Sequence, residues 1–372
     1  MPIAKQQRTA MSIAELIGQL CMIGFEGTEV TPDLRAWMQE FRPGGIILFS
    51  RNLVDPVQIA HLTNDLQALA GDIPLLIGID QEGGRVSRLP SGFTIFPPAT
   101  TVAHSGSTEL AYQAAAVTAK ELRAVGINMN MAPVLDIHTN PSNPIIGDRA
   151  FGTEPEQVCL MGAATLAGLH DHRVLACGKH FPGHGDTSTD SHVELPVVHA
   201  TRERLESVEL KPFQYAIAHG LQAIMTAHVH YPDLDPINPA TLSAMILTDI
   251  LRQQMGFSGV ILSDDLEMGA IVNHSTVGEA AVHSLQAGVD MLLVCKTRRL
   301  ATDTIKAVSR AVESHVLDQS RLETSVARIA SVKQQFVFPY HPIDIPSIPH
   351  TVGISAHRHV LAQIQGQFRT LT

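Results

Sequence analysis

Short apolar runs alternate with longer amphipathic segments along most of the chain, and this alternation restricts the fold more than any other feature of the sequence. The runs are nearly unbroken, as expected of strands buried on both faces of a sheet. Such strands are parallel, and parallel strands need helical crossovers between them. The eight runs are Leu20–Phe25, Gly45–Phe49, Pro74–Ile79, Ile127–Leu135, Val174–Cys177, Ala223–Ala227, Gly259–Leu262 and Asp290–Cys295.

Segments with helical spacing lie between these runs, and eight strand–helix units in one chain predict a (β/α)8 barrel of the TIM type. An open, doubly wound sheet is the alternative. It usually has fewer strands and a glycine-rich phosphate loop after the first strand, which this sequence lacks. The predicted helices are Pro56–Ala70, Thr108–Val125, Glu154–His170, Thr201–His219, Ala244–Met255, Val277–Ala287 and Thr302–His315.

The last part of the chain differs from the rest. Four prolines between Pro339 and Pro349 break the repeating pattern, and a short helix is expected from Ser355 to Gly366. We therefore expect a single barrel domain over residues 1–337 and a proline-rich C-terminal arm over residues 338–372. The arm either packs on the outside of the barrel or is flexible or contacts another subunit.

Charge and cysteine content limit the compartment and the partners. The net charge is 26 − 36 = −10, which does not favour nucleic acid or an anionic membrane as a partner. None of the four cysteines forms a CxxC pair, and three lie in apolar runs, which fits buried free thiols in a reducing compartment. Ile13–Leu20 is predicted to be an amphipathic helix capped by Ser12, not a signal peptide. We expect a cytoplasmic protein, monomeric and without a membrane span.

Polar side chains follow six of the eight runs. In a barrel these positions all meet at the C-terminal mouth, where such folds place catalysis. Helix capping would explain one or two of the groups but not six. The groups are Arg51-Asn52, Asp80 to Arg85, Asp136 with His138, Lys179-His180, His228 with His230, and Asp264-Asp265.

The densest group opens the stretch from Lys179 to His192, KHFPGHGDTSTDSH, which holds three histidines and two aspartates. Asp190 precedes His192 by two residues, so the pair can form an Asp–His dyad that titrates near neutral pH. Asp264, after another apolar run, is placed as a nucleophile or as a stabiliser of a cationic transition state. Because neighbouring strand residues alternate, only one of Asp264 and Asp265 should face the mouth.

Cationic side chains accompany these anions. Lys179, Arg88 and Arg149 suit hydrogen bonds to hydroxyl, amide or carboxylate groups of a ligand, or salt bridges that close the mouth. His184 lies in the turn after His180, and a structural role inside the loop is at least as plausible for it as direct catalysis.

Several motifs resemble the β-N-acetylglucosaminidases of glycoside hydrolase family 3. They span most of residues 12–335, and the KH-to-DSH motif is the most specific of them. Related two-domain β-glucosidases have the barrel but are not expected to carry the Asp-Ser-His signature. The motifs are GGIILFSRN (44–52), IDQEGGRVSRL (79–89), MNMAPVLDI (129–137), GDRAFG (147–152), KHFPGHGDTSTDSH (179–192), MTAHVHYP (225–232) and GVILSDDLEM (259–268).

The resemblance implies a role for each matching residue. Asp264 falls at the family's nucleophile, and His192, paired with Asp190, at its acid/base. Glu267 departs from the family, which often has a small polar residue there, and this affects loop mobility or leaving-group preference. The residues that match positions holding the terminal N-acetylglucosamine are Asp80, Arg88, Arg149, Lys179 and His180.

The implied activity is that of a retaining exo-β-N-acetylglucosaminidase acting on small peptidoglycan fragments in cell-wall recycling. The expected substrate is GlcNAc-1,6-anhydro-MurNAc with or without peptide, and no cofactor or metal is expected. His192 replaces the second carboxylate of ordinary retaining glycosidases, and its loop must be mobile enough to bring it to the sugar.

Other interpretations stay open. The acetamido oxygen of the substrate, not Asp264, could be the nucleophile. A family 3 β-glycosidase of other or broad specificity is an alternative, as is a sugar-binding barrel without activity. The last is a metal-dependent amidohydrolase-like barrel with His228, His230, His180, Lys179 and Asp264 as ligands, although such barrels carry their HxH motif on the first strand.

Overall fold

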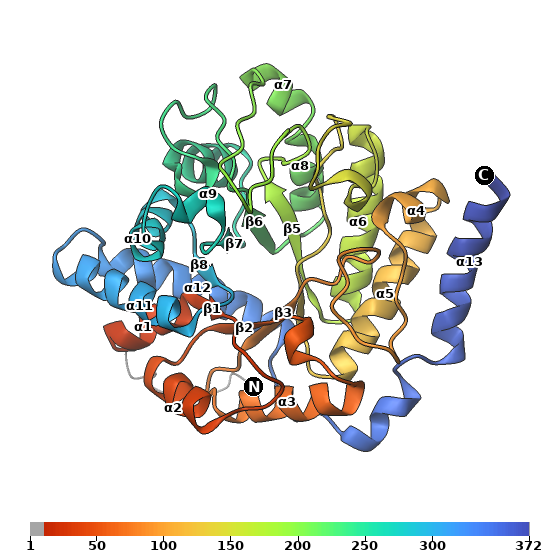
Figure 1. Ribbon diagram of the computed structural model, residues 1–372, viewed down its shortest axis with the longest axis horizontal. Coiled ribbons are helices and arrows are strands. Elements are labelled where there is room, and N and C mark those ends of the chain that lie inside the picture. The colour runs from red at the N-terminus through yellow and green to blue at the C-terminus, as the bar shows by residue number, and fades with distance from the viewer. Residues whose placement is uncertain (1–10, 372) are drawn as a thin grey trace, which may run out of the picture.

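The computed structural model describes residues 11–371 and has eight parallel strands at its centre with helices around them (Figure 1). Each strand pairs with the next, and β1 pairs with β8, so that the barrel closes. The predicted (β/α)8 fold is confirmed, and each predicted apolar run overlaps one strand. Two strands, β5 and β7, continue past the predicted ends of their runs at Cys177 and Leu262, so Lys179, His180 and Asp264 lie within strands and do not follow them. The strands are β1 Cys21–Ile23, β2 Gly45–Leu48, β3 Leu76–Ile79, β4 Met129–Asn130, β5 Leu175–Phe181, β6 Ala223–Thr226, β7 Val260–Asp265 and β8 Met291–Val294.

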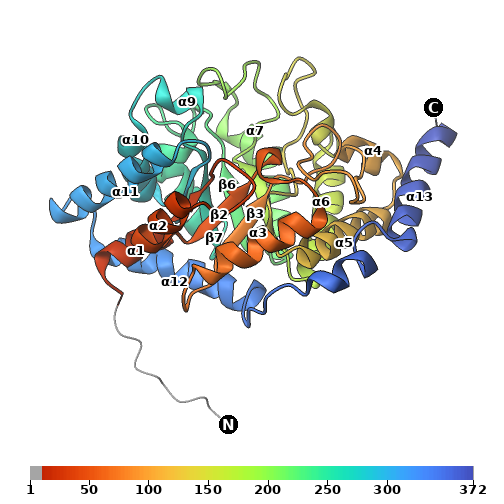
Figure 2. The ribbon, with the colours of Figure 1, turned by 60° about the horizontal axis from the view of Figure 1, so that its bottom comes forward.

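Helices follow the strands and cover the outside of the barrel (Figures 1 and 2). One helix, α1, precedes β1 and begins after Ser12, whose hydroxyl and backbone form a capping box with Glu15, as the sequence predicted for the cap. The α-helices are α1 Ile13–Gln19, α2 Pro32–Phe41, α3 Pro56–Ala68, α4 Ala99–His104, α5 Thr108–Ala124, α6 Pro155–Asp171, α7 Arg202–Ser207, α8 Lys211–Ala218, α9 Gly269–Val272, α10 Val277–Ala287, α11 Arg298–Glu313, α12 Gln319–Phe336 and α13 Ser355–Leu371. A π-helix spans Met245–Gln254, and 3-10 turns lie at Ser50–Asn52, Gly147–Arg149, Ala240–Leu242 and Ile345–His350.

The predicted helix over Thr201–His219 is wrong as a single element, because the chain forms α7 and α8 with a break between them. Pro212 lies in the first turn of α8, where its missing N–H and fixed φ favour the start of a helix. Glu209, in the break, turns inward and is buried, with Arg204 bonded to its carboxylate at 3.0 Å.

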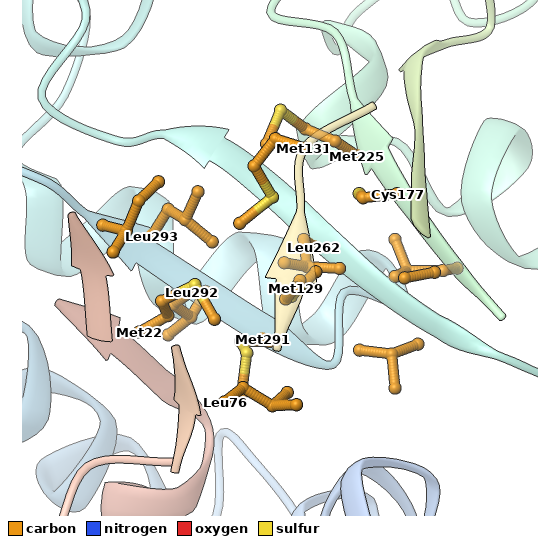
Figure 3. Packing of buried hydrophobic residues seen from close by; sticks show 14 of the residues in the cluster. Met22, Leu76, Met129, Met131, Cys177, Met225, Leu262, Met291, Leu292 and Leu293 are labelled. Carbon is orange, nitrogen blue, oxygen red and sulfur yellow. The ribbon is translucent and has the colours of Figure 1, made fainter. Parts of the chain in front are cut away.

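Methionine side chains fill much of the barrel interior (Figure 3). Met22 lies against Gly45 of β2, and Met131 lies against Gly78 of the neighbouring strand β3. A Cβ atom at Gly45 would lie 2.6 Å from the Cε of Met22, and one at Gly78 would lie 2.9 Å from that of Met131. The glycines therefore leave room for flexible side chains that adapt to an irregular space. All four cysteines are buried and free, as expected from their apolar surroundings.

The segment after α12 runs along the outside of the barrel, and α13 lies beside α4 and α5 (Figure 2). One polar anchor of this segment is the buried carboxylate of Glu121 on α5. This group accepts hydrogen bonds from the Gly353 amide at 2.9 Å and from the His357 ring at 2.8 Å, and also from the amide and hydroxyl of Thr94 at 2.7 and 2.8 Å. One carboxylate thus joins the C-terminal arm to the segment that follows β3.

Across residues 11–371, the helices are all too short or too polar to cross a lipid bilayer.

Candidate active site

A cavity of about 460 Å³ opens at the carboxyl ends of the strands, where the sequence placed the polar groups. Its walls come from the strand ends and loops of β2, β3, β4, β5, β7 and β8. All of the predicted site residues line it: Asp80, Arg88, Arg149, Lys179, His180, Asp190, His192 and Asp264. Strand ends far apart in the sequence therefore converge on one space.

Asp264 lies near the end of β7, and its Oδ1 accepts the amide hydrogen of Asp265 at 2.8 Å. Burial acts to raise the pKa of this carboxyl, but the neighbouring rings of His228 and His180 and the amide of Asp265 together hold it below its usual value. Asp264 is therefore ionised at neutral pH, as a nucleophile must be.

Asp265 has a different role, although it also borders the cavity. Its carboxylate turns back to the backbone and accepts the amides of Glu267 at 3.1 Å and Cys295 at 3.2 Å. Burial and the nearby Glu267 carboxylate raise its pKa to about 6. Asp265 therefore holds the backbone of the loops after β7 and β8.

Glu267 ties the loop after β7 to the loop after β8. Its carboxylate accepts the Lys296 amide at 2.6 Å and the Thr297 amide at 3.1 Å. These amides lie at the start of α11, where the Thr297 side chain makes no capping bond of its own. Glu267 therefore caps α11 from a neighbouring loop, which a small polar residue is too short to do.

The Asp190–His192 dyad is formed. Oδ1 of Asp190 accepts both the backbone amide and Nδ1–H of His192, each at 2.8 Å. Burial acts to raise the pKa of Asp190, but these two bonds lower it below the usual value. A carboxylate that fixes Nδ1–H leaves Nε2 as the atom that exchanges protons with a ligand. The His192 side chain is 63% exposed, consistent with an acid/base that faces the open part of the cavity.

The backbone around the dyad is docked on the first residues of α9. The amide of Gly269 donates to the His192 carbonyl, and that of Ala270 donates to the Ser191 carbonyl, both at 3.1 Å. Asn273 donates from its side chain to the carbonyl of Val193 at 2.8 Å. The loop that carries the Asp190–His192 dyad thus rests on the helix that follows the strand of Asp264.

Lys179 is buried on β5 between two carboxylates. Its Nζ lies 2.7 Å from Asp80 and 2.7 Å from Glu82. Burial acts to lower the pKa of Lys179, but these two anions raise it above its usual value. Arg149 binds both oxygens of Glu82 at 2.8 Å, a bidentate pair. Lys179 and Arg149 therefore both form salt bridges at the mouth and border the cavity.

Arg88 keeps hydrogen-bonding capacity for a ligand. Its guanidinium is 3.8 Å from Asp80, too long for a direct hydrogen bond, and lies over the ring of Phe49. Within the described residues, its Nε is buried and has no hydrogen-bond partner. A buried donor without a partner is costly, and a ligand's hydroxyl or carbonyl oxygen would satisfy it.

His180 follows Lys179 and points one ring nitrogen at Asp136. Nδ1 lies 2.7 Å from Oδ2 of Asp136, which also accepts the amides of His180 and His184 through Oδ1. The carboxylate fixes Nδ1 as the donor, so Nε2 is left for a ligand. His184 is buried and bonds the hydroxyls of Thr187 and Ser191, each at 2.9 Å.

Two important charged residues were not predicted as site residues. Glu82 and Asp136 both follow strands and belong to the polar groups after β3 and β4, but their partners, Lys179, Arg149 and His180, come from other parts of the chain. The sequence marked each of them only as an acidic residue near the end of a predicted strand. It did not show which cationic side chain each would pair with, because those pairs form only when the barrel closes.

The histidines considered as metal ligands are occupied by protein groups. His228 bonds the Thr241 hydroxyl at 2.7 Å and the Asp265 carbonyl at 3.0 Å, and His230 bonds the Asp235 carbonyl at 3.0 Å. Over residues 11–371, no three His, Cys, Asp or Glu side chains are grouped to hold a metal ion.

Comparison with known proteins defines the class first. The model of the glycosyl hydrolase family 3 N-terminal domain matches residues 12–332, which include the whole barrel. A barrel with ionised carboxylates at its mouth and this match define a glycoside hydrolase. The chain belongs to glycosyl hydrolase family 3.

Relatives within the family resemble the chain over most of its length. A beta-hexosaminidase of Thiobacillus denitrificans is 43% identical over 290 residues, which cover 76% of this chain and 80% of the relative. A family 3 beta-N-acetylglucosaminidase of Paenibacillus sp. has a TM-score of 0.91 at 42% identity, covering 96% of this chain and 69% of that one. NagZ of Neisseria gonorrhoeae, solved with N-trifluoroacetyl-D-glucosamine, has a TM-score of 0.77 at 32% identity, with 94% and 98% covered.

Proposed function

We propose that the chain is a retaining exo-β-N-acetylglucosaminidase that removes terminal N-acetylglucosamine from peptidoglycan fragments. The observation that carries the proposal is that the Asp190–His192 dyad and the ionised Asp264 border the same cavity. The names of the relatives support the hexosaminidase activity, and the sugar bound to the Neisseria enzyme supports the substrate class.

The reaction follows from the two groups. The carboxylate of Asp264 attacks the anomeric carbon while Nε2–H of protonated His192 donates its proton to the glycosidic oxygen, and the aglycone leaves. His192, now neutral, takes a proton from water, whose oxygen attacks the same carbon and releases Asp264. Two displacements at one carbon give net retention.

The remaining cavity residues hold the sugar. Arg88 has an unsatisfied buried donor, and His180 offers Nε2. Asp80, held by Lys179 at 2.7 Å, is an acceptor for sugar hydroxyls. Arg149 acts from behind Glu82 and fixes the position of Lys179 through that shared carboxylate.

The mouth favours an aglycone that carries a carboxylate. Lys296 is exposed at the rim of the cavity and is the cation we assign to such a group. Arg85 borders the same cavity, but its guanidinium is paired with Asp148 at 2.8 Å. The lactyl group of 1,6-anhydro-MurNAc is such an anion. A neutral histidine base also avoids the electrostatic repulsion that a second catalytic carboxylate would exert on this lactyl anion. The setting we propose is the recycling of cell-wall fragments in the cytoplasm, which the resemblance of the Lys179–His192 motif implies.

Hydrolysis of an aryl N-acetylglucosaminide and of the matching aryl glucoside tests the proposal, in the wild type and in Asp264→Asn. We expect turnover of the N-acetylglucosaminide only, abolished by the substitution. Preference for the glucoside would favour a family 3 glycosidase of other specificity. Loss of activity after chelation would favour the metal-dependent alternative, and binding without turnover would favour a sugar-binding barrel.

A further inference from the structure

We infer that His184 and Gly269 are positioning residues, which hold the segment Asp190-Ser191-His192 from two elements and so set where the His192 ring lies. The inference rests on the proposed function, because it assigns these residues to the acid/base step. Neither residue needs to touch the substrate. His184 acts through the side chain of Ser191, and Gly269 acts through the backbone carbonyl of His192.

Ser191 is the buried member of the segment. The residue is 2% exposed, whereas the side chains of Asp190 and His192 are 36% and 63% exposed. The two outer residues bond each other, so the dyad is internally fixed, but the His192 ring is mostly exposed. The attachment of the dyad to the barrel therefore depends on Ser191 and on the backbone on either side of it.

His184 provides the attachment for the Ser191 hydroxyl, at 2.9 Å from Nε2. The ring of His184 is itself fixed, because Nδ1 bonds Thr187 and the backbone amide bonds the Asp136 carboxylate at 2.6 Å. Burial lowers the pKa of His184 to about 4, so the ring is neutral at physiological pH. A neutral ring with both nitrogens bonded is a rigid support and takes no part in proton transfer.

Gly269 provides the second attachment. Its amide donates to the His192 carbonyl at 3.1 Å, and a Cβ atom at this position would lie only 2.7 Å from that same oxygen. Backbone atoms cannot relax as the tip of a flexible side chain can. Any larger residue at position 269 would therefore push the loop, and His192 with it, away from the start of α9.

Ser191→Ala and Gly269→Ala test the two attachments separately. General acid catalysis matters most for poor leaving groups, so a displaced His192 slows a phenyl N-acetylglucosaminide more than a 2,4-dinitrophenyl one. We expect kcat/KM to fall about tenfold for the phenyl substrate and less than about twofold for the dinitrophenyl substrate, part of the roughly 10²–10⁴-fold that such catalysis contributes. Adding Ser191→Ala to His192→Ala should cost nothing further, because the lost group acts only through His192.

Matched controls come from α10. Ser284→Ala removes another buried serine hydroxyl, one without a hydrogen-bond partner in the described residues, and Gly278→Ala introduces a methyl group 2.8 Å from the Cβ of Ala307, away from the mouth. Gly278→Ala should lower stability, Ser284→Ala should not, and neither should change the ratio between the two substrates. Equal losses for both substrates in the site variants, or additive losses in the His192→Ala background, would overturn the inference.

Amide hydrogen exchange of residues 188–194 supplies a readout that does not need turnover. Exchange should be faster in Ser191→Ala and Gly269→Ala than in the wild type, and unchanged in the two controls. Unchanged exchange in the site variants overturns the inference whether or not the protein is active. Absence of turnover in the wild type, with exchange that responds as expected, would instead contradict the proposed function alone.

Discussion

The Nδ1 atom of His180 lies 2.7 Å from the Oδ2 atom of Asp136, a carboxylate with no exposed surface. The same carboxylate accepts two backbone amides, that of His180 within β5 and that of His184 in the loop after it. One buried anion therefore fixes both the ring of His180, which borders the cavity, and the path of the chain toward His192.

Asp136→Asn should destabilise the fold and weaken sugar binding. An amide group cannot accept three hydrogen bonds as a carboxylate does, so one donor is left unsatisfied at a cost on the order of 2–3 kcal/mol. Burial acts to raise the pKa of Asp136, but His180 and the His184 amide hold it below the usual value. Its stabilisation is thus present above pH ~4 and is lost as the pH falls through the lowered pKa.

Urea unfolding of wild type and Asp136→Asn at neutral and acidic pH measures this. The difference in the free energy of unfolding between the two proteins should be largest at pH 7 and should decrease at acidic pH. Asp171→Asn, which alters an exposed aspartate bonded only to the Tyr112 hydroxyl at 2.9 Å, is the control and should change little. A difference that grows on acidification would contradict the assignment.

Lys179→Met should be among the most destabilising single changes at the mouth. It leaves Glu82 and Asp80 without the ammonium that lies 2.7 Å from each. Removing one partner of a buried ion pair costs about 3–5 kcal/mol. Arg202→Met breaks the exposed pair with Glu206 and should cost less than about 1 kcal/mol in the same denaturation experiment. Equal losses in the free energy of unfolding for the two variants would show that the ion pairs of Lys179 do not stabilise the fold.

Asp265→Asn should change the pH dependence of stability in the opposite sense to Asp136→Asn. The pKa of Asp265 is raised to about 6, so the folded state binds its proton more tightly than the unfolded state does. The associated stability is fully present below pH ~4 and is lost as the pH rises to about 6. The asparagine variant lacks this loss, so its midpoint in urea relative to wild type should rise between pH 4 and pH 7. A flat difference over that range would argue against the raised pKa.

Glu267→Ser should loosen the contact between the loops after β7 and β8. Serine cannot reach the amides of Lys296 and Thr297, and losing such a cap costs about 1 kcal/mol. Glu267→Gln keeps one acceptor oxygen and should lie between wild type and serine. Thermal unfolding ranks the three proteins, and hydrogen exchange at residues 296–298 locates the effect. If the Glu267→Ser variant were as stable as the wild type, the cap would make no contribution to stability.

Trapping with a fluorinated, slowly hydrolysed N-acetylglucosaminide should label Asp264 covalently. Peptide mass analysis after denaturation locates the label, and Asp264→Asn is the unlabelled control. Labelling should persist in Asp265→Asn, because that carboxylate is turned to the backbone of Cys295 and Glu267. An unlabelled, active enzyme would instead support attack by the substrate's own acetamido oxygen.

The strands could be predicted from sequence because burial on both faces demands unbroken apolar runs, and the cavity residues because strand ends in a barrel share one mouth. The break between α7 and α8 was missed, although Pro212 marks it, because the amphipathic pattern continues through it. The pairing of Glu82 with Lys179 was also missed, because neither residue identifies its partner until the sheet closes. The docking of Ser191 on His184 and α9 depends on loop geometry that spacing alone does not encode.

Glu121 has a practical consequence for anyone who modifies the molecule. The same carboxylate binds the C-terminal arm, through Gly353 and His357, and Thr94 in the segment after β3. A tag, a fusion partner or a surface tether at the end of α13 would therefore pull on a group that also orders a segment near the mouth. The exposed turn at Val316, between α11 and α12, offers an attachment point that leaves this group undisturbed.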